Sequence, residues 1–151
     1  MRKNVINYSL ALALLSTPLF AETVNLEMLN KRDDGQKMVY SEDIAYITEG
    51  DTINWIAKDK GHNVEFIDGP KGWEAPKKSS ISKDFTYTFD EPGVYTYVCT
   101  PHATMGMIAT VVVGDVTEEH IKSVEDAKAK GKSKKKYEEL LTEIKEKVLK
   151  N

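Results

Sequence analysis

The chain has 151 residues, of which 24 are acidic and 21 are basic, so its formal net charge at pH 7 is −3. A chain of this length supports one domain with its own core and hardly two. The sequence carries no basic excess, which argues against a nucleic-acid-binding protein.

The first 21 residues have the pattern of a secretory signal peptide. Basic residues at positions 2 and 3 precede the apolar run Leu10–Leu15, and Ala21 ends the segment. This run is shorter than the ~20 residues of a membrane-spanning helix, which disfavours a membrane anchor. We predict a leader at residues 1–21, cleaved after Ala21. Its removal takes away two basic residues and no acids, which leaves 130 residues with a net charge of −5. We therefore expect a periplasmic protein that is not inserted in the membrane.

From residue 22 to residue 114 the sequence consists of short β-type runs separated by turn residues. Several runs alternate apolar and polar side chains, as half-buried strands do. The first four runs predict a hairpin-like meander, and residues 68–82, rich in glycine, proline and lysine, predict a surface loop. The fold class is therefore mainly β, a sandwich of about eight strands. These strands are predicted at residues 23–29, 38–40, 44–47, 52–56, 63–66, 85–89, 94–98 and 108–113.

Two helices are predicted after residue 114, where the apolar spacing changes from two residues to three or four. Thr117 is a suitable cap for the first helix, and two acids follow in its first turn. Apolar residues three apart within 121–127 lie along roughly one face of that helix. Gly131 separates it from a second amphipathic helix that includes residues 137–148.

The C-terminal extension, residues 115–151, is expected to pack on the same domain. Its lysine run, Lys132–Lys136, is a candidate for an anion or membrane site. The extension holds ten lysines against nine acids, however, so it is nearly neutral. We interpret the run as a solvated helix face.

The stretch from Cys99 to Met107 concentrates the side chains that bind soft metal ions. These nine residues hold the only cysteine, one of three histidines and two of five methionines. Two histidines and one cysteine with a weak axial methionine define an electron-transfer copper site. The stretch supplies Cys99, His102 and two methionines, Met105 and Met107, so one more histidine is needed.

His62 is the best candidate for the second histidine. It follows Gly61 and begins a β-type run, whereas His120 lies in the first turn of the predicted helix beyond the sandwich. Taken alone, His62 would be read as an ordinary strand-end histidine. Because Cys99 and His102 form part of a copper ligand set that lacks one histidine, we interpret His62 as the missing metal ligand.

Two other roles for the lone cysteine explain less of the pattern. A buried structural thiol does not account for a histidine three residues later and a methionine eight residues later. A thiol nucleophile needs an acid–base or oxyanion setting that the sequence does not suggest. Metal binding explains all of these residues together.

The ligand segments resemble a known family, the cupredoxins, and within it the bacterial pseudoazurins. Cys99–His102 followed by Met105–Ala109 is similar to the pseudoazurin copper loop, and Gly61–Glu65 is similar to its first-ligand segment. Met28–Lys31, Met38–Val39 and the two C-terminal helices also resemble that family. The resemblance implies a Greek-key β-sandwich with copper as the cofactor, and it assigns residues 22–114 to the copper domain.

The resemblance also implies roles for individual residues. Met107 rather than Met105 would be the long axial ligand, because the flanking residues follow the pseudoazurin pattern. Asn63 would tie the two ligand segments together and donate to the cysteine sulfur, and Met38 would lie beside His102 without binding copper. The implied ligands of one type 1 copper ion are His62, Cys99, His102 and Met107.

One position departs from the family pattern. Many pseudoazurins have a lysine before the cysteine, within a basic ring around the exposed ligand edge, but this chain has Val98. Other lysines are adjacent in sequence to segments expected at that end. The expected partner-docking residues are Lys31, Lys60, Lys77 and Lys78, with Lys37 and Lys58 as further candidates.

The function implied is that of a monomeric electron carrier between the respiratory chain and periplasmic reductases such as copper nitrite reductase, with a cytochrome as donor. An enzyme is disfavoured, because a second, open metal centre needs several more histidines, and only His120 remains. The alternative is a periplasmic copper chaperone or storage protein, which would bind Cu(I) in an open, methionine-rich site.

Overall fold

The structure is a computed structural model and describes residues 20–150. The predicted leader lies outside the described residues except for its last two. The described residues contain eight strands, which confirms the predicted β-sandwich. They are β1 (Thr23–Lys31), β2 (Lys37–Tyr40), β3 (Ile44–Ile47), β4 (Thr52–Ile56), β5 (Glu65–Asp68), β6 (Phe85–Thr88), β7 (Gly93–Val98) and β8 (Ile108–Val113).

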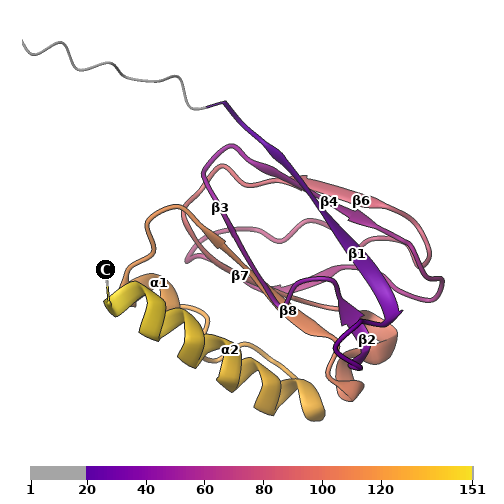
Figure 1. The fold of residues 1–151 in the computed structure, drawn as a ribbon. Helices are drawn as coiled ribbons and strands as arrows, with labels where there is room; N and C mark the ends of the chain where they lie inside the picture. The colour runs from indigo at the N-terminus through magenta and orange to yellow at the C-terminus, as the bar shows by residue number, and fades with distance from the viewer. Residues whose placement is uncertain (1–19, 151) are drawn as a thin grey trace, which may run out of the picture.

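The strands form two four-stranded sheets, ordered β2-β1-β4-β6 and β3-β8-β7-β5 (Figure 1). The predicted meander is therefore wrong. Strand β1 lies between β2 and a parallel β4, while β3 leaves this sheet to pair in parallel with β8. Alternation in a sequence shows which face of a strand is buried, but it does not identify the neighbouring strand.

Strand β7 is buried on both faces, and this position carries the cysteine into the interior. Tyr95, Tyr97 and Cys99 face the core between the sheets, whereas Val94 and Val98 face the C-terminal helices. The two sets follow the two-residue period of a strand. Each large apolar side chain buried in this way contributes about 1.5–3 kcal/mol to folding. Cys99 therefore stands at the end of one of the best supported strands.

The helices α1 (Glu118–Lys122) and α2 (Lys132–Leu149) pack on the outer face of the sheet that contains β7 and β8. Helix α1 ends sooner than the 121–127 pattern predicts. The hydroxyl of Ser123 donates to the carbonyl of His120 at 2.7 Å, which offers the backbone a local alternative to another helical turn. Val124 is nevertheless buried in the predicted way.

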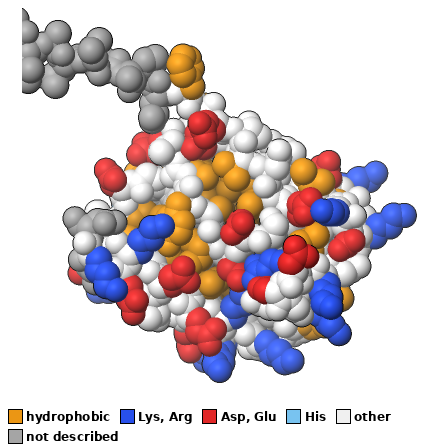
Figure 2. Space-filling view, in the orientation of Figure 1, with side chains coloured by type: hydrophobic (Ala, Val, Ile, Leu, Met, Phe, Trp, Pro, Cys, Tyr) orange, Lys and Arg blue, Asp and Glu red, His pale blue; other side chains and the backbone are white. Residues whose placement is uncertain are grey.

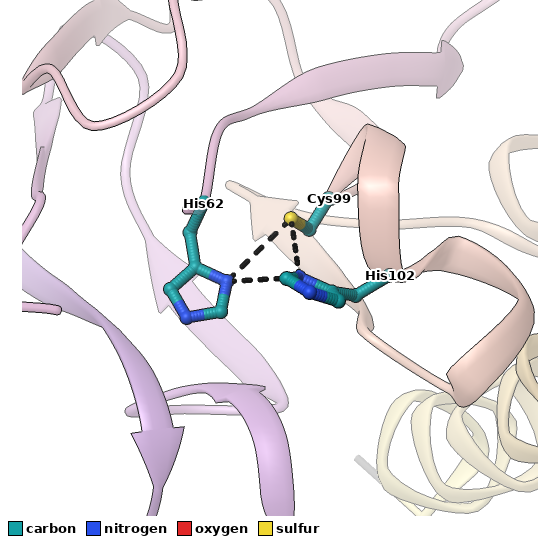
Figure 3. Close-up of side chains that lie close together, drawn as sticks. All are labelled: His62, Cys99 and His102. Atoms are coloured by element: carbon teal, nitrogen blue, oxygen red, sulfur yellow. Dashed lines mark hydrogen bonds between the residues drawn. The ribbon is translucent and has the colours of Figure 1, made fainter. Parts of the chain in front are cut away.

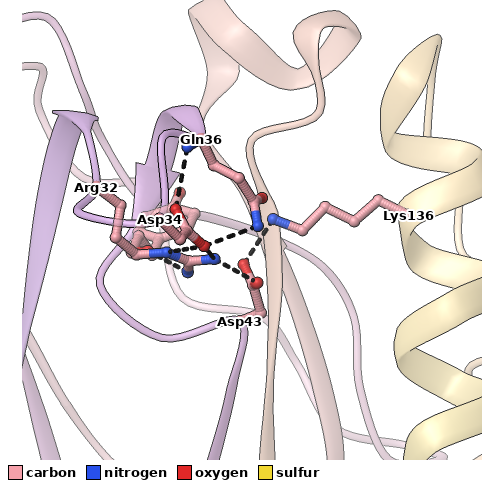
Figure 4. Close-up of polar contacts among 6 residues, drawn as sticks. Arg32, Asp34, Gln36, Asp43 and Lys136 are labelled. Carbon is pink, nitrogen blue, oxygen red and sulfur yellow. Dashed lines mark hydrogen bonds and ion pairs between the residues drawn. The ribbon is translucent and has the colours of Figure 1, made fainter.

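A polar network ties α2 to the sandwich (Figure 4). Lys136 of α2 reaches Asp43, which precedes β3, with 2.6 Å between Nζ and Oδ1. The second carboxylate oxygen of Asp43 accepts from Arg32 at 2.9 Å, and Arg32 also pairs with Asp34. None of the helices in the described part of the chain has the length and apolar composition needed to cross a membrane.

Candidate metal centre

His62 lies in an irregular segment between β4 and β5 and is fully buried. Strand β5 begins two residues later than predicted, because Val64 exchanges hydrogen bonds with Ser79 rather than with a strand. The segment is anchored by Ser82, whose hydroxyl accepts from the Gly61 amide at 2.8 Å and whose amide donates to the His62 carbonyl at 2.9 Å. Gly61 has a φ of 93°, which favours glycine. The glycine at position 61 thus favours the turn that precedes His62.

Cys99 and His102 are presented by a single tight turn, the 3₁₀-helix η1 (Thr100–Met105), which follows β7. Pro101 occupies its first turn, where its fixed φ is suitable. Gly106 ends it with a φ of 104°. The Cys99 carbonyl accepts from the His102 amide at 3.0 Å. Two ligand-type side chains three residues apart are thereby turned to the same side.

The three donor side chains converge in the fold (Figure 3). The sulfur of Cys99 lies 3.7 Å from Nδ1 of His62 and 3.4 Å from Nδ1 of His102, and the two nitrogens are 3.1 Å apart. Donors at about 2.0–2.3 Å from a shared ion at trigonal angles stand roughly 3.5–3.8 Å from one another. The observed spacing is close to this range. A thiolate with two imidazoles is also the donor set that suits copper, so the residues present fit the ion.

Burial sets the protonation preferences of these groups. It lowers the pKa of His62, and the neighbouring His102 lowers that pKa further, so His62 favours the neutral imidazole that a metal ligand requires. Burial raises the pKa of the Cys99 thiol, and backbone hydrogen bonds from Asn63 and His102 oppose this effect only in part. A raised pKa is the opposite of what an activated thiol nucleophile needs.

Asn30, at the end of β1, orients the His62 ring, and the sequence did not single out this residue. Its Oδ1 lies 2.9 Å from Nε2 of His62. Because an amide oxygen only accepts, Nε2 carries the proton, which leaves the lone pair on Nδ1 toward Cys99. The only available signal was that Asn30 falls in the Met28–Lys31 segment of the family resemblance.

Asn63 joins the two ligand-bearing segments. Its Oδ1 accepts from the Thr100 amide at 2.8 Å, and its Nδ2 donates to the Thr100 hydroxyl at 2.9 Å. Thr100 directly follows Cys99 in η1, and Asn63 directly follows His62. The pair of hydrogen bonds fixes the distance between the two segments. The Asn63 side chain does not donate to the cysteine sulfur as expected, because its Nδ2 donates to the Thr100 hydroxyl and the Ser79 carbonyl, and the backbone of Asn63 donates to the sulfur instead.

The two candidate methionines differ in their surroundings. Met107 is completely buried in the core cluster that contains Cys99, whereas Met105 is 52% exposed. The Met107 backbone accepts from the Cys99 amide at 3.0 Å and donates to the His102 carbonyl at 3.2 Å. Met38 packs against the same cluster with an unusual φ of 53°. Its location beside His102 stays a prediction.

The four expected docking lysines are all exposed. Lys31 follows Asn30, and Lys60 precedes Gly61. Lys77 and Lys78 precede the Ser79–Val64 contact. Each lysine therefore lies within two positions of a residue in a segment that supports the metal centre.

Comparison with known proteins identifies the family. Residues 26–114 match the model of copper-binding proteins of the plastocyanin/azurin family. A pseudoazurin from Paracoccus pantotrophus is 39% identical over 136 residues, which cover 89% of this chain and 92% of that protein. A pseudoazurin from Methylorubrum extorquens is 40% identical over 125 residues, covering 80% of this chain and 83% of that protein.

A solved structure gives the same result. The pseudoazurin from Sinorhizobium meliloti superposes with a TM-score of 0.75 at 41% identity, and the match covers 82% of this chain and 96% of that one. The chain therefore belongs to the plastocyanin/azurin family of copper-binding proteins and, within it, to the pseudoazurins.

Proposed function

We propose that this blue copper protein carries single electrons between periplasmic redox proteins, with His62, Cys99, His102 and Met107 holding its copper ion. The observation that carries the proposal is the convergence of one sulfur and two Nδ1 atoms within 3.1–3.7 Å. The bound ion supplies one-electron chemistry between Cu(II) and Cu(I). The chain's own side chains do not change partners or conformation in the proposed cycle.

The rigidity of the centre supports this role. Asn30 fixes the His62 ring, and Asn63 fixes the spacing between the two ligand-bearing segments. Supports of this kind hold ligands in one orientation. A site that cannot rearrange suits a carrier, because its ligands need little movement when the electron enters or leaves.

The closed site argues for electron transfer over copper storage. Cys99, His62 and Met107 are all fully buried, and His102 is half-buried. A chaperone would need an open site from which the ion is released. We assign the electron path to the His102 edge, because this ligand alone of the four is partly exposed. No substrate is converted in this proposal.

The exposed lysines are proposed to dock an acidic partner. The start of α2 adds to this surface. The Cβ of Lys132 would lie 3.6 Å from a Cβ built on Gly106, which ends the ligand turn. Figure 2 shows basic side chains over the right-hand and lower right edge, with acidic ones among them, and α2 begins there in Figure 1. Lys132, the first residue of the run interpreted as a solvated face, therefore lies beside the ligand turn. Charge attraction of this type mainly raises the association rate.

The partners and the location rest on family resemblance and on the predicted leader. We propose a cytochrome of the respiratory chain as donor and a periplasmic reductase such as copper nitrite reductase as acceptor. The carrier would act as a monomer, which suits small and short-lived redox encounters.

The ligand set is tested by adding one equivalent of Cu(II) to the purified protein. We expect an intense visible band from the Cys99 thiolate, at a stoichiometry of one ion per chain, and its complete loss in Cys99→Ser. His120→Ala is the matched control, because His120 lies on α1 and is expected to leave the band unchanged. A band that survives Cys99→Ser would refute the assignment.

A further inference from the structure

The first turn of α2 contacts the ligand turn η1 through a buried side chain. The hydroxyl of Ser133 donates a hydrogen bond to the carbonyl of Ala103, which follows His102 in the chain. Ser133 is completely buried, although it is a polar residue near a helix end. The contact joins segments that are 30 residues apart.

The backbones of these two segments also approach closely. Gly131, with a φ of 57°, precedes α2, and a Cβ built there would lie 2.6 Å from the Thr104 carbonyl oxygen. Any side chain at residue 131 would therefore push the start of α2 away from η1. Glycine is needed for the close approach as well as for the left-handed conformation.

Helix α2 is held independently of this contact. The Tyr137 hydroxyl donates to the Val124 carbonyl at 2.6 Å and accepts from the Thr96 hydroxyl at 2.9 Å. Lys136 adds the ion pair with Asp43. These contacts anchor the helix to the sandwich apart from its contact with η1.

The ligand turn is less buried than α2, and its middle residue Ala103 packs against the cluster that contains Tyr137 and Leu141 of α2. None of the residues of η1, Thr100–Met105, is buried. Its ends are fixed by Cys99 and Met107, but its middle is held from outside by α2. The carbonyl of Ala103 accepts from the Gly106 amide only at a long 3.3 Å, so the hydroxyl of Ser133 is a main restraint there.

We propose that Ser133 and Gly131 are positioning residues for the copper centre, because they brace η1 and so fix the His102 imidazole relative to Cys99. The inference rests on the proposed ligand set. It gives the C-terminal extension a function at the metal centre beyond covering the sheet. Loosening the brace should weaken copper binding and alter the visible spectrum, since both depend on where His102 is held.

The test compares Ser133→Ala with Tyr137→Phe in the purified full protein. Both changes remove a buried hydroxyl from α2 and both are expected to lower the thermal midpoint. Only Ser133→Ala should weaken Cu(II) binding, by roughly tenfold in a chelator competition, and shift the visible band. In the metal-free protein it should also accelerate hydrogen exchange at the Gly106 and Met107 amides.

Gly131→Ala is the second variant, because it keeps the Ser133 hydroxyl and separates the same backbones. It should weaken copper binding in the same direction. The inference is overturned if Ser133→Ala and Tyr137→Phe change affinity equally, or if neither changes it. If the unmodified protein shows no Cu(II) band, the proposed ligand set is refuted, and this inference with it. If the unmodified protein shows a normal band that Ser133→Ala does not change, only this inference is refuted.

Discussion

At the scale of single residues, the two nitrogens of His62 have separate tasks. Nε2 faces Asn30 and Nδ1 faces Cys99 and His102. The ring therefore has one proton and one free lone pair in defined places. A ligand whose tautomer is fixed before the metal arrives binds with less reorganisation.

Asn30→Ala should remove this constraint and leave Nε2 without its acceptor. We expect Cu(II) affinity to fall by about tenfold, at the low end for the loss of a residue that orients a ligand. Asn25→Ala is the matched control, because Asn25 is on the same strand but its amide oxygen accepts from Asn54 instead. A chelator competition checks both. Equal affinities for the two variants would show that Asn30 does not orient His62.

Met107→Leu should alter the copper centre, whereas Met105→Leu should not. The thioether of Met107 is buried with Cys99, so its loss should change the reduction potential and the visible spectrum. Met105→Leu replaces a largely exposed side chain and should leave both unchanged. Voltammetry and the visible spectrum of the two copper-loaded variants check this. A spectral change confined to Met105→Leu would reverse the axial assignment.

The sequence predicted the site best where its residues are close together in the chain. Cys99, His102 and Met107 fall within nine residues, so the sequence alone indicated that they bind one metal ion together. Asn30 and Ser133 were not predicted as part of the centre. Asn30 contacts His62 across 32 residues and Ser133 contacts Ala103 across 30, and such contacts arise only when strands and helices have packed.

At the scale of elements, α2 is fastened to the sandwich by the Asp43 carboxylate. Burial alone would raise the pKa of Asp43, but hydrogen bonds from Arg32 and Lys136 outweigh burial and lower it. The ionised form is therefore favoured more in the folded than in the unfolded chain. Its stabilising contribution is complete above the unfolded pKa of 3.8 and is lost as the pH falls through the lowered folded value.

Asp43→Asn should cost about 1 kcal/mol of unfolding free energy at neutral pH, a modest value because the network is partly solvated. Between about pH 6 and about pH 2, the difference from the unmodified protein should stay constant down to about pH 4 and then shrink as the pH falls through the lowered folded pKa. Denaturant unfolding across this range checks the prediction. Asp33→Asn, which removes the same charge from an exposed site, is the control. A difference that is constant with pH would contradict the role of the carboxylate.

The elements themselves were more predictable than their pairing. Short β-type runs between turn residues located all eight strands, and several of these runs also alternate because one strand face is buried. They left open that β3 crosses to the second sheet, since partner choice depends on contacts distant in sequence. The first C-terminal helix was predicted with Thr117 as its cap, but not its early end at Lys122, where the Ser123 hydroxyl donates to the His120 carbonyl.

At the scale of the whole molecule, the protein is acidic, whereas the proposed docking residues are basic. Although the net charge is −3, the proposed docking lysines adjoin the segments that support the metal centre. Because salt screens interactions between exposed charges beyond about 10 Å, the lysines nearest the contact affect an acidic partner more than the net charge does.

Lys60→Glu combined with Lys77→Glu should slow association with an acidic redox partner by about tenfold at low salt, with the difference vanishing at high salt. Stopped-flow electron transfer at several ionic strengths checks this. Lys122→Glu is the control, since it lines a groove with Pro70 and Glu91, at the opposite end of β7 from Cys99. If the double variant keeps the salt dependence of the unmodified protein, the docking surface lies elsewhere.

The most direct test of the central proposal is a redox titration of the copper-loaded protein, followed at its visible band. An electron carrier with a closed centre should bleach and recover fully, with one electron per chain and no loss of copper over repeated cycles. A protein that shows no visible band when oxidised, or that releases copper on reduction, would contradict the proposal and favour copper delivery or storage.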